Sequence, residues 1–419
     1  MQPSYIVDVE TAASQCWDVI IVGGGMVGAA LALGLGQEKF NVLLLERHHP
    51  ELKWNPEPVY GARVSALTRA SENILKNLGA WQGIENRRYH PFTAMHVWDE
   101  VTSAEVHFSA ADMGEPNLGY TVENSIVQAA IWEQMIQLTN VKVLLGEKLA
   151  QLALENEQAC LVLHGGAKLK ANLVVAADGA MSQVRQLANI GLETHDYEQC
   201  AVVGCVKTEL SHQDTCWQRY RKDGPFAYLS MVNNISSVAW YLPTDKMQWA
   251  LDLSDGAYAE ALKDASDGKL GAVTEVAERI AFPLVRRHAE HYVKSNLALV
   301  GDAAHTINPQ AGQGVNLGFL DAAALIETLV EARKRNKPIG QLSVLRRYER
   351  WRRGDNALVQ RSMEGFDWLF KQDAELKKTF RKTLMPVANN LTPVKNWLMS
   401  QALNGREALP TLAKKFGQE

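Results

Sequence analysis

Three glycines near the start of the chain have the spacing of a phosphate-binding turn. Gly23, Gly25 and Gly28 form the pattern G-x-G-x-x-G between a β-branched run and an apolar helical stretch. The first glycine permits a sharp turn, the second lets the main chain approach a pyrophosphate, and the third lets the helix pack closely on the strand. The phosphates would meet the positive N-terminal end of that helix. The pattern therefore predicts a dinucleotide site that also includes Met26 and Val27.

An acidic residue stands where such a site needs a ribose ligand. Glu46 ends the next apolar run, and Arg47 follows it. A carboxylate at this position accepts hydrogen bonds from the ribose hydroxyls of an adenosine and repels a 2′-phosphate. The glycine motif and this acid do not by themselves distinguish NAD from FAD.

The elements that must hold these residues are a strand at 18–22, a turn at 23–26, a helix at 27–36 and a second strand at 41–46. The uncharged stretch that they share is long enough for a membrane span. A β-branched run followed by three glycines argues against one, and an acidic flank without Lys or Arg argues against a secretion signal. We therefore expect a βαβ unit, preceded by a loose leader over 1–16.

Composition narrows the class of protein. The chain has 419 residues, 47% of them hydrophobic, which is enough for two or three domains. A net charge of −4 gives no reason to expect nucleic acid, and five cysteines suggest a reducing, cytoplasmic compartment without disulfides. Cys200 and Cys205 lie five apart in a strand-like segment, so we expect two core cysteines on opposite faces. The histidine pairs lack partners at metal-ligand spacing, and no metal site is predicted.

Hydrophobic periodicity predicts the other elements. They are a helix at 64–79, a hairpin at 96–108, a helix at 123–138, strands converging on 178–179, a mostly stranded region at 195–283 with one helix near 256–264, a strand and turn at 298–305, a helix at 314–333 and a helical remainder at 343–419.

Two further motifs follow the glycine turn. The first runs from Asp178 and Gly179 to Arg185, and the second is GDAAHTINPQAGQGVNLGFLD at 301–321. In this order the three motifs resemble those of the class A FAD-dependent aromatic-ring hydroxylases. Within that group, the passages GYTVENSIVQAAIW, FPLVRRHAEHYV and AHTINPQAGQGVNLGF are most similar to the ubiquinone-biosynthesis hydroxylases. The resemblance covers nearly the whole chain.

The resemblance implies an α/β fold. A Rossmann-type FAD-binding domain would comprise 17–188 and 284–342, interrupted by a β-sheet substrate domain at 189–283. Residues 88–112 would add strands to the substrate domain, and a helical region at 343–419 would complete the chain.

Asp302 follows a buried strand and is placed to hydrogen-bond a ribityl hydroxyl of FAD. Gly312 and Gly314 would open a helix whose positive end faces the flavin N1–C2=O edge, where negative charge gathers on reduction. The resemblance further places Pro309 near the isoalloxazine, Arg63 against the flavin, and the Asp178–Gly179 turn between the FAD site and the NAD(P)H path. The remaining expected cofactor contacts are Asn124, near the pyrophosphate, and Val315 and Asn316.

The family's chemistry requires no protein nucleophile. Flavin reduced by NAD(P)H reacts with O2 to give a C4a-hydroperoxide, and an electron-rich ring attacks its distal oxygen. The resemblance implies that this ring belongs to a polyprenylated benzoquinol. We therefore expect no catalytic side chain, and a dry cavity with Phe226, Tyr228, Met231 and Trp240 as candidates for its wall.

Three other functions remain open at this stage. The same machinery could act on a soluble phenolic acid held by Arg219, Arg221 or Arg286, the protein could be an FAD-dependent prenyl reductase, or it could be a flavin-binding structural subunit of a biosynthetic complex. The segment 333–353 carries nine basic residues and one acid. Solvated helix faces explain this pattern, and so does a surface for peripheral contact with an anionic membrane or a partner.

Overall fold

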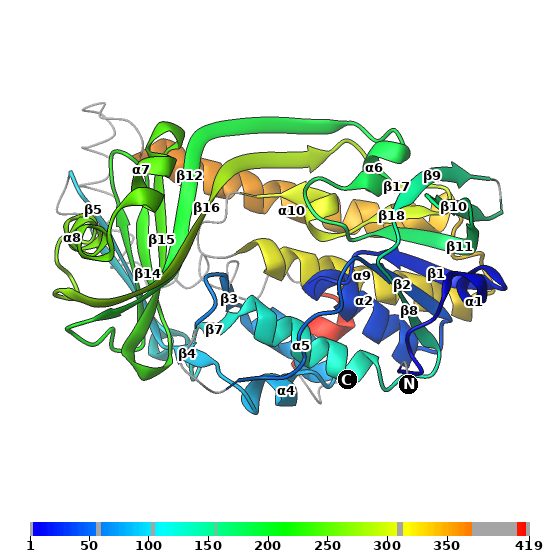
Figure 1. Ribbon diagram of the computed structural model, residues 1–419, viewed down its shortest axis with the longest axis horizontal. Coiled ribbons are helices and arrows are strands. Elements are labelled where there is room, and N and C mark those ends of the chain that lie inside the picture. The colour runs from blue at the N-terminus through cyan, green and yellow to red at the C-terminus, as the bar shows by residue number, and fades with distance from the viewer. Residues whose placement is uncertain are drawn as a thin grey trace.

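The computed structural model describes residues 3–55, 60–101, 105–155, 157–307, 313–370 and 409–415, with side chains omitted for 313 and 362–370. Figure 1 shows two bodies, each built on a large sheet, with two long strands and a long helix running between them.

The first sheet forms around the predicted βαβ unit. Strand β1 (Cys16–Val22) pairs in parallel with β2 (Val42–Glu46) on one side and with β11 (Lys168–Ala176) on the other. Helices α2 (Met26–Gln37), α5 (Asn124–Met135) and α9 (Gln313–Lys334) pack around it. Strands buried on both faces read as continuous apolar runs, which explains the composition of β1 and β2. The sheet also contains β8 (Val141–Leu145), β9 (Leu149–Leu154), β10 (Ala159–Leu163), β17 (Val293–Lys294) and β18 (Leu297–Leu299).

The second sheet is made largely of antiparallel pairs. Helices α7 (Met247–Asp252) and α8 (Asp255–Ala265) pack on one of its faces, and its strands β12 and β16 extend to the first body (Figure 1). The spatial order of its strands is β19 (His305–Thr306), β16 (Val273–Ala289), β12 (Leu192–Thr208), β15 (Ile235–Pro243), β14 (Phe226–Ser230), β13 (Thr215–Tyr220), β5 (Ala94–Asp99) and β6 (Glu105–Ser109). The hairpin from the first half of the chain thus lies in this sheet, and the boundary expected at 283/284 falls inside β16.

Smaller elements complete the molecule. A third sheet contains β3 (Val64–Leu67), β7 (Gly119–Glu123) and β4 (His90–Phe92). The other helices are α1 (Val9–Ala13), α3 (Arg69–Asn77), α4 (Trp81–Glu85), α6 (Gln183–Leu187) and α10 (Leu342–Phe370), and the 3-10 turns include η4 (Gly301–Ala303) and η6 (Thr411–Ala413).

Three sequence expectations differ from the structure. The expected helix at 64–79 begins only at Arg69, because residues 64–67 pair with β7 and the Thr68 side chain caps the helix by accepting from the Ser71 N–H. The expected loose leader is docked: α1 buries Ala12, whose carbonyl oxygen accepts from the Trp17 indole at 2.9 Å. The expected helical remainder is not helical at 409–415, which packs against α3 and α9.

Candidate functional site

The glycine turn has the geometry that its spacing predicts. Gly23 has φ +104°, and a Cβ there would lie 2.4 Å from the Ala177 carbonyl oxygen of the second motif. A Cβ on Gly28 would lie 1.9 Å from the Gly23 oxygen, so α2 must begin against the turn. Gly25, which caps α2, has open space where a Cβ would stand. The turn therefore offers main-chain N–H groups and room for a pyrophosphate at the helix N-terminus.

Glu46 lies at this turn. Its carboxylate accepts hydrogen bonds from the Gly24 N–H and, at 2.7 Å, from the Arg47 N–H. Two residues of α5 that the sequence analysis missed hold the turn from the other side. The Gln128 amide and the Trp132 indole both donate to the Gly24 carbonyl oxygen, at 2.9 and 2.8 Å. Their helical spacing resembled ordinary core packing, so no pattern singled them out.

The second and third motifs are joined by an arginine. Arg185 is buried and donates to the Ala303 carbonyl oxygen at 2.8 Å and to the Ala180 oxygen at 2.9 Å, and its burial lowers the pKa of its guanidinium. Asp178 accepts from the Val184 N–H at 3.1 Å through one oxygen. Its other oxygen is buried without a hydrogen-bond partner among the described residues. An acceptor left in this state is ready for a ligand hydroxyl or amide.

Asp302 and Arg63 come together although 239 positions separate them in the chain. The Asp302 side chain is accessible to solvent but closely surrounded by protein, and this desolvation raises the pKa of its carboxyl group. The charges of His305 and Arg63 act in the opposite direction. Arg63 also stacks over the Phe282 ring, with 5.5 Å from the guanidinium carbon to the ring centroid. An acid at the start of the third motif, with the charge of Arg63 acting on it, can hold the hydroxyls and the polar ring edge of a flavin.

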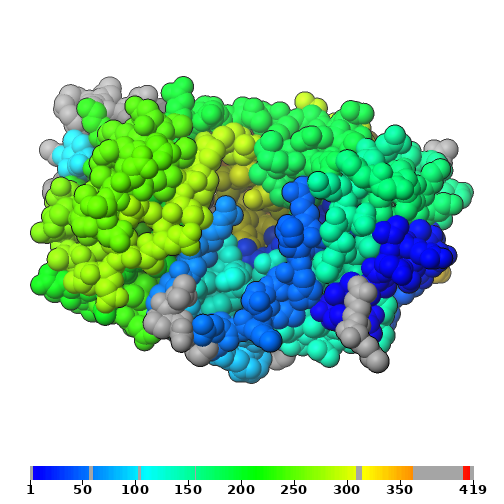
Figure 2. Space-filling model, viewed as in Figure 1, coloured from blue at the N-terminus to red at the C-terminus, as the bar shows by residue number. Residues whose placement is uncertain are grey.

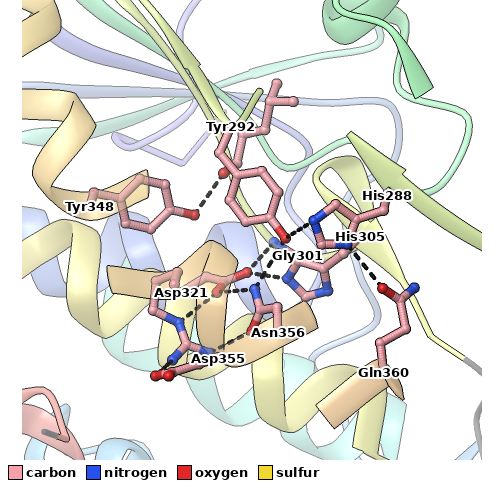
Figure 3. A network of polar contacts seen from close by, with 11 residues as sticks. His288, Tyr292, Gly301, His305, Asp321, Tyr348, Asp355, Asn356 and Gln360 are labelled. Carbon is pink, nitrogen blue, oxygen red and sulfur yellow. Dashed lines mark hydrogen bonds and ion pairs between the residues drawn. The ribbon is translucent and has the colours of Figure 1, made fainter. Parts of the chain in front are cut away.

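A buried polar network lies beneath the third motif (Figure 3). The Asp321 carboxylate accepts from the His305 Nε2–H at 2.5 Å, from the Arg352 Nε–H at 2.8 Å and from the Gly301 N–H at 3.1 Å. Burial alone would raise the pKa of Asp321, but His305 and Arg352 overcome this effect and hold the pKa at about 2. His305 therefore acts as a hydrogen-bonding partner of Asp321.

Other predicted cofactor residues stand around the same region. Asn316 is only 2% exposed, and its side chain forms hydrogen bonds with Thr68, Ser71 and Ala66. Any contact of Asn316 with the flavin would therefore come from its main-chain atoms.

Val27 packs against Gly318, where a Cβ would lie 2.5 Å from the Val27 side chain, so this contact brings α9 close to α2. The Asn124 Oδ1 accepts from the Ser65 hydroxyl at 2.6 Å, and Gly314 and Val315 lie in the first turn of α9. Pro309 and Gly312 lie outside the described residues.

Figure 2 shows the molecule hollowed between the two bodies, with the yellow of the third-motif region at the floor of the hollow. Three of the four expected wall residues do not face this hollow. Phe226, Tyr228 and Trp240 are at most 3% exposed and pack with Tyr258 of α8, on the helix-covered face of the second sheet. Met231 lies elsewhere, against Tyr60 and next to β3.

The opposite face of the second sheet supplies a different wall. Phe282, Ala201 and Tyr241 stand in one cross-strand row and pack together with Leu284. Phe282 is the residue over which Arg63 stacks, so this row faces the predicted flavin contact. Alternation along a strand puts Trp240 and Tyr241 on opposite faces. The sequence showed that alternation but gave no sign of which face α7 and α8 would cover.

The cysteines and histidines form no metal centre or disulfide within the described part of the chain. Cys200 and Cys205 are free and belong to different apolar clusters, which confirms the expectation of opposite faces. His90, His212 and Asp214 have ligand atoms within 4.8 Å of one another. However, His212 accepts from the Asp214 main-chain N–H at 3.1 Å through Nδ1, and its Nε2 lies 2.8 Å from the Met231 carbonyl oxygen. Both ring nitrogens are therefore committed to the protein.

The arrangement fits FAD: the glycine turn has an open approach, Asp178 has an unpartnered oxygen, and Arg63 and Asp302 carry opposite charges. The three motifs meet, because Gly23 lies against Ala177 and Arg185 donates to Ala303. The fold and these motifs define an FAD-dependent monooxygenase, a class that uses NAD(P)H and O2. The family described as FAD binding domain matches residues 16–360.

Comparison with known proteins narrows this class. The chain is 40% identical to 3-demethoxyubiquinol 3-hydroxylase of Escherichia coli (strain K12) over 353 residues, 84% of this chain and 90% of that protein. It is 33% identical to ubiquinone hydroxylase UbiL of Rhodospirillum rubrum over 96% of this chain and 92% of that one. The crystal structure of p-nitrophenol 4-monooxygenase PnpA from Pseudomonas putida DLL-E4 shares the fold, with a TM-score of 0.76, 20% identity and coverage of 94% and 99%. The chain belongs to the ubiquinone-biosynthesis hydroxylase family of FAD-binding proteins, as its motifs predicted.

Proposed function

We propose that this protein hydroxylates the ring of a polyprenylated benzoquinol in ubiquinone biosynthesis, with FAD as cofactor, NAD(P)H as reductant and O2 as co-substrate. The observation that carries the proposal is similarity along most of the chain to relatives named for hydroxylation in that pathway. The contacts that join the three motifs support it.

The chain's own residues bind and orient the cofactor. The N–H groups of the Gly23–Gly28 turn would hold the pyrophosphate, Glu46 the adenosine ribose, and Asp302 the ribityl chain. Arg63 would hold the polar edge of the flavin ring, with Pro309, Gly312 and Gly314 positioning it. Bound FAD supplies hydride acceptance from NAD(P)H and activation of O2.

The substrate needs a dry, apolar wall. The row of Phe282, Ala201 and Tyr241 provides one opposite the predicted flavin contact. Such a wall excludes water and orients a ring that needs no protein nucleophile to react. Met231 remains a candidate at the edge of this region, whereas Phe226, Tyr228 and Trp240 would act only by supporting the sheet.

The arginines suggested as anchors for a soluble phenolic acid have other partners. Arg219 donates to the carbonyl oxygens of Asp264 and Ala265 at 3.1 Å, and Arg286 pairs with Glu193 at 2.8 Å. Arg221 lies 3.9 Å from Glu100, and two of its guanidinium nitrogens are buried without a hydrogen-bond partner among the described residues. The contacts of Arg219 and Arg286 favour the apolar quinol over an anionic substrate.

A prenylated quinol dissolves in lipid, so the proposal includes peripheral contact with the inner face of a membrane. In the described residues, no helix is both long and apolar enough to cross a bilayer. Contact would therefore come from the surface, and the exposed arginines of α10 are its proposed source.

The test is turnover by purified, FAD-loaded protein with a short-chain methoxy-methyl-benzoquinol under 18O2. We expect NAD(P)H oxidation stimulated by the quinol and a product carrying one labelled oxygen. Stimulation by 4-hydroxybenzoate but not by the quinol would indicate a soluble phenolic substrate. Addition of two hydrogens to a prenyl chain without label would indicate a reductase, and FAD binding without any NAD(P)H oxidation would indicate a structural subunit. Each of these three results would overturn the proposal.

A further inference from the structure

A second cleft lies between α10 and the strands β12 and β16. Its volume is about 470 Å3. The sheet contributes Arg286 and His288, and α10 contributes Arg350, Arg353, Gln360 and Arg361. Residues 350, 353 and 361 follow helical spacing, so their side chains share one face of α10.

Among the described residues, the two acids of this cleft have partners other than its exposed arginines. Of its two acids, Glu193 pairs with Arg286 at 2.8 Å, and Glu349 accepts from the Tyr292 N–H at 2.7 Å. Arg350, Arg353 and Arg361 are exposed and have no ion pair or hydrogen bond among the residues that the structure describes. Two other exposed arginines of 333–353 differ: Arg335 and Arg347 both pair with Glu331.

The floor of the cleft holds an unsatisfied donor. Gln360 is only 5% exposed, and its amide nitrogen is buried without a hydrogen-bond partner in the described chain. Its oxygen lies 3.0 Å from His288 Nδ1. Figure 3 shows Gln360 at the outer end of the network that begins at Asp321.

That network determines which way the Gln360 amide faces. The Arg352 guanidinium donates to Asn356 Oδ1 at 2.7 Å, so the Asn356 amide nitrogen points toward Asp321 and the Tyr292 hydroxyl, at 3.1 and 3.5 Å. Tyr292 then donates to His288 Nε2 at 3.4 Å, and His288 carries its proton on Nδ1 and donates to Gln360 Oε1. The Gln360 NH2 group is left without an acceptor among the described residues, on a side chain that lines the cleft.

We propose that this cleft binds a phosphate group, with the Gln360 amide donating to it from the floor and Arg350, Arg353 and Arg361 supplying the charge. Arginine guanidinium groups match phosphate oxygens in geometry as well as in charge. The same chemistry belongs to inorganic pyrophosphate, a nucleotide and an anionic lipid headgroup.

The test is calorimetric titration of the FAD-saturated protein with inorganic pyrophosphate at constant ionic strength. We expect binding that Arg350→Ala/Arg353→Ala weakens at least about tenfold, because two charge-assisted contacts are lost. Gln360→Met should weaken it several-fold without loss of FAD. Arg346→Ala is the matched control, because Arg346 is exposed on the same helix and does not line the cleft.

Two further probes separate the sources of the phosphate. Binding to phosphatidylglycerol vesicles but not to phosphatidylcholine vesicles, lost in the double variant, would identify a lipid headgroup. Competition by adenosine 2′,5′-bisphosphate for the pyrophosphate site would identify a nucleotide. An absence of pyrophosphate binding, or equal weakening by Arg346→Ala and by the double variant, would overturn the proposal. These readouts measure binding only, so they stand apart from the proposed hydroxylation.

Discussion

The two bodies of the molecule are stabilised by contacts of different kinds. Beneath the third motif, Asp321, His305 and Arg352 are almost fully buried and held by ion pairs. In the second body, Phe226, Tyr228 and Trp240 form an apolar core with α8. The first arrangement depends on the position of each charge, and the second on the apolar area removed from water.

This difference has consequences for function. The Gly301 N–H donates to Asp321, so the charged network directly holds the turn that carries Asp302. The aromatic core supports the sheet from the face opposite Phe282, so it acts on the hollow only through the backbone. Loss of one charge in the network should therefore weaken FAD binding, whereas loss of volume in the aromatic core should mainly lower stability.

The largest expected effect comes from Arg352→Met. This change leaves the Asp321 carboxylate buried without its arginine partner and should lower the free energy of unfolding by about 3–5 kcal/mol. Because Gly301 shares that carboxylate, FAD affinity should fall too. Urea unfolding and flavin fluorescence measure the two effects. Arg353→Met removes the same charge from an exposed neighbouring position and should cost no more than about 0.5 kcal/mol. Equal losses from the two variants would show that the network is not the cause.

Two substitutions with smaller effects distinguish the roles of the two faces of the second sheet. Phe226→Leu should lower the free energy of unfolding by about 1–2 kcal/mol and leave the ratio of hydroxylated product to hydrogen peroxide unchanged. Phe282→Leu should change stability less, because Phe282 is only half-buried, and should raise the peroxide fraction by admitting water to the hollow. Assays of both products in both variants make the comparison. Increased peroxide from Phe226→Leu alone would mean that the assignment of the faces is reversed.

Local patterns in the sequence are enough to predict the βαβ unit of the first body. The G-x-G-x-x-G turn needs a strand before it and a helix after it, and both are local features of the chain, so β1, α2 and β2 lie within one or two residues of prediction. The sequence predicts helix at the short β3 because Val64–Leu67 is as apolar as the first turn of an amphipathic helix, and only pairing with the distant β7 makes it a strand.

Prediction of the wall of the hollow requires long-range contacts that local sequence patterns do not show. Phe226 and Phe282 are both aromatic residues in alternating strands. Which of them faces the flavin depends on where α7 and α8 pack, and α7 itself was not predicted. The Asp321–Arg352 pair likewise joins α9 to α10 across 31 positions. A single sequence offers no signal for a contact of that kind.

The smallest effect concerns the dependence of stability on pH. Burial is the main cause that lowers the pKa of His90, His212 and His288 in the folded protein. In the unfolded chain these groups titrate near about 6.5. Below that pH the unfolded chain binds more protons, so their contribution to stability is present above pH 6.5 and is lost as the pH falls through that value. Asp321, with its lowered pKa, contributes until the pH falls below about 4 and approaches 2.

Urea unfolding between pH 8 and 5 at constant ionic strength therefore measures the contribution of these histidines to the free energy of unfolding. Each histidine can add a slope of at most about 1.4 kcal/mol per pH unit, reduced where solvent screens the charge. His288→Gln should flatten the profile, and His291→Gln should leave it unchanged, because the His291 side chain is 66% exposed. Arg352→Met should lower the whole curve without changing its slope in this range, because the lowered pKa of Asp321 keeps that carboxylate ionised there in the native protein. A change of slope in Arg352→Met would mean that the loss of the Arg352 charge alters the titration of the histidines.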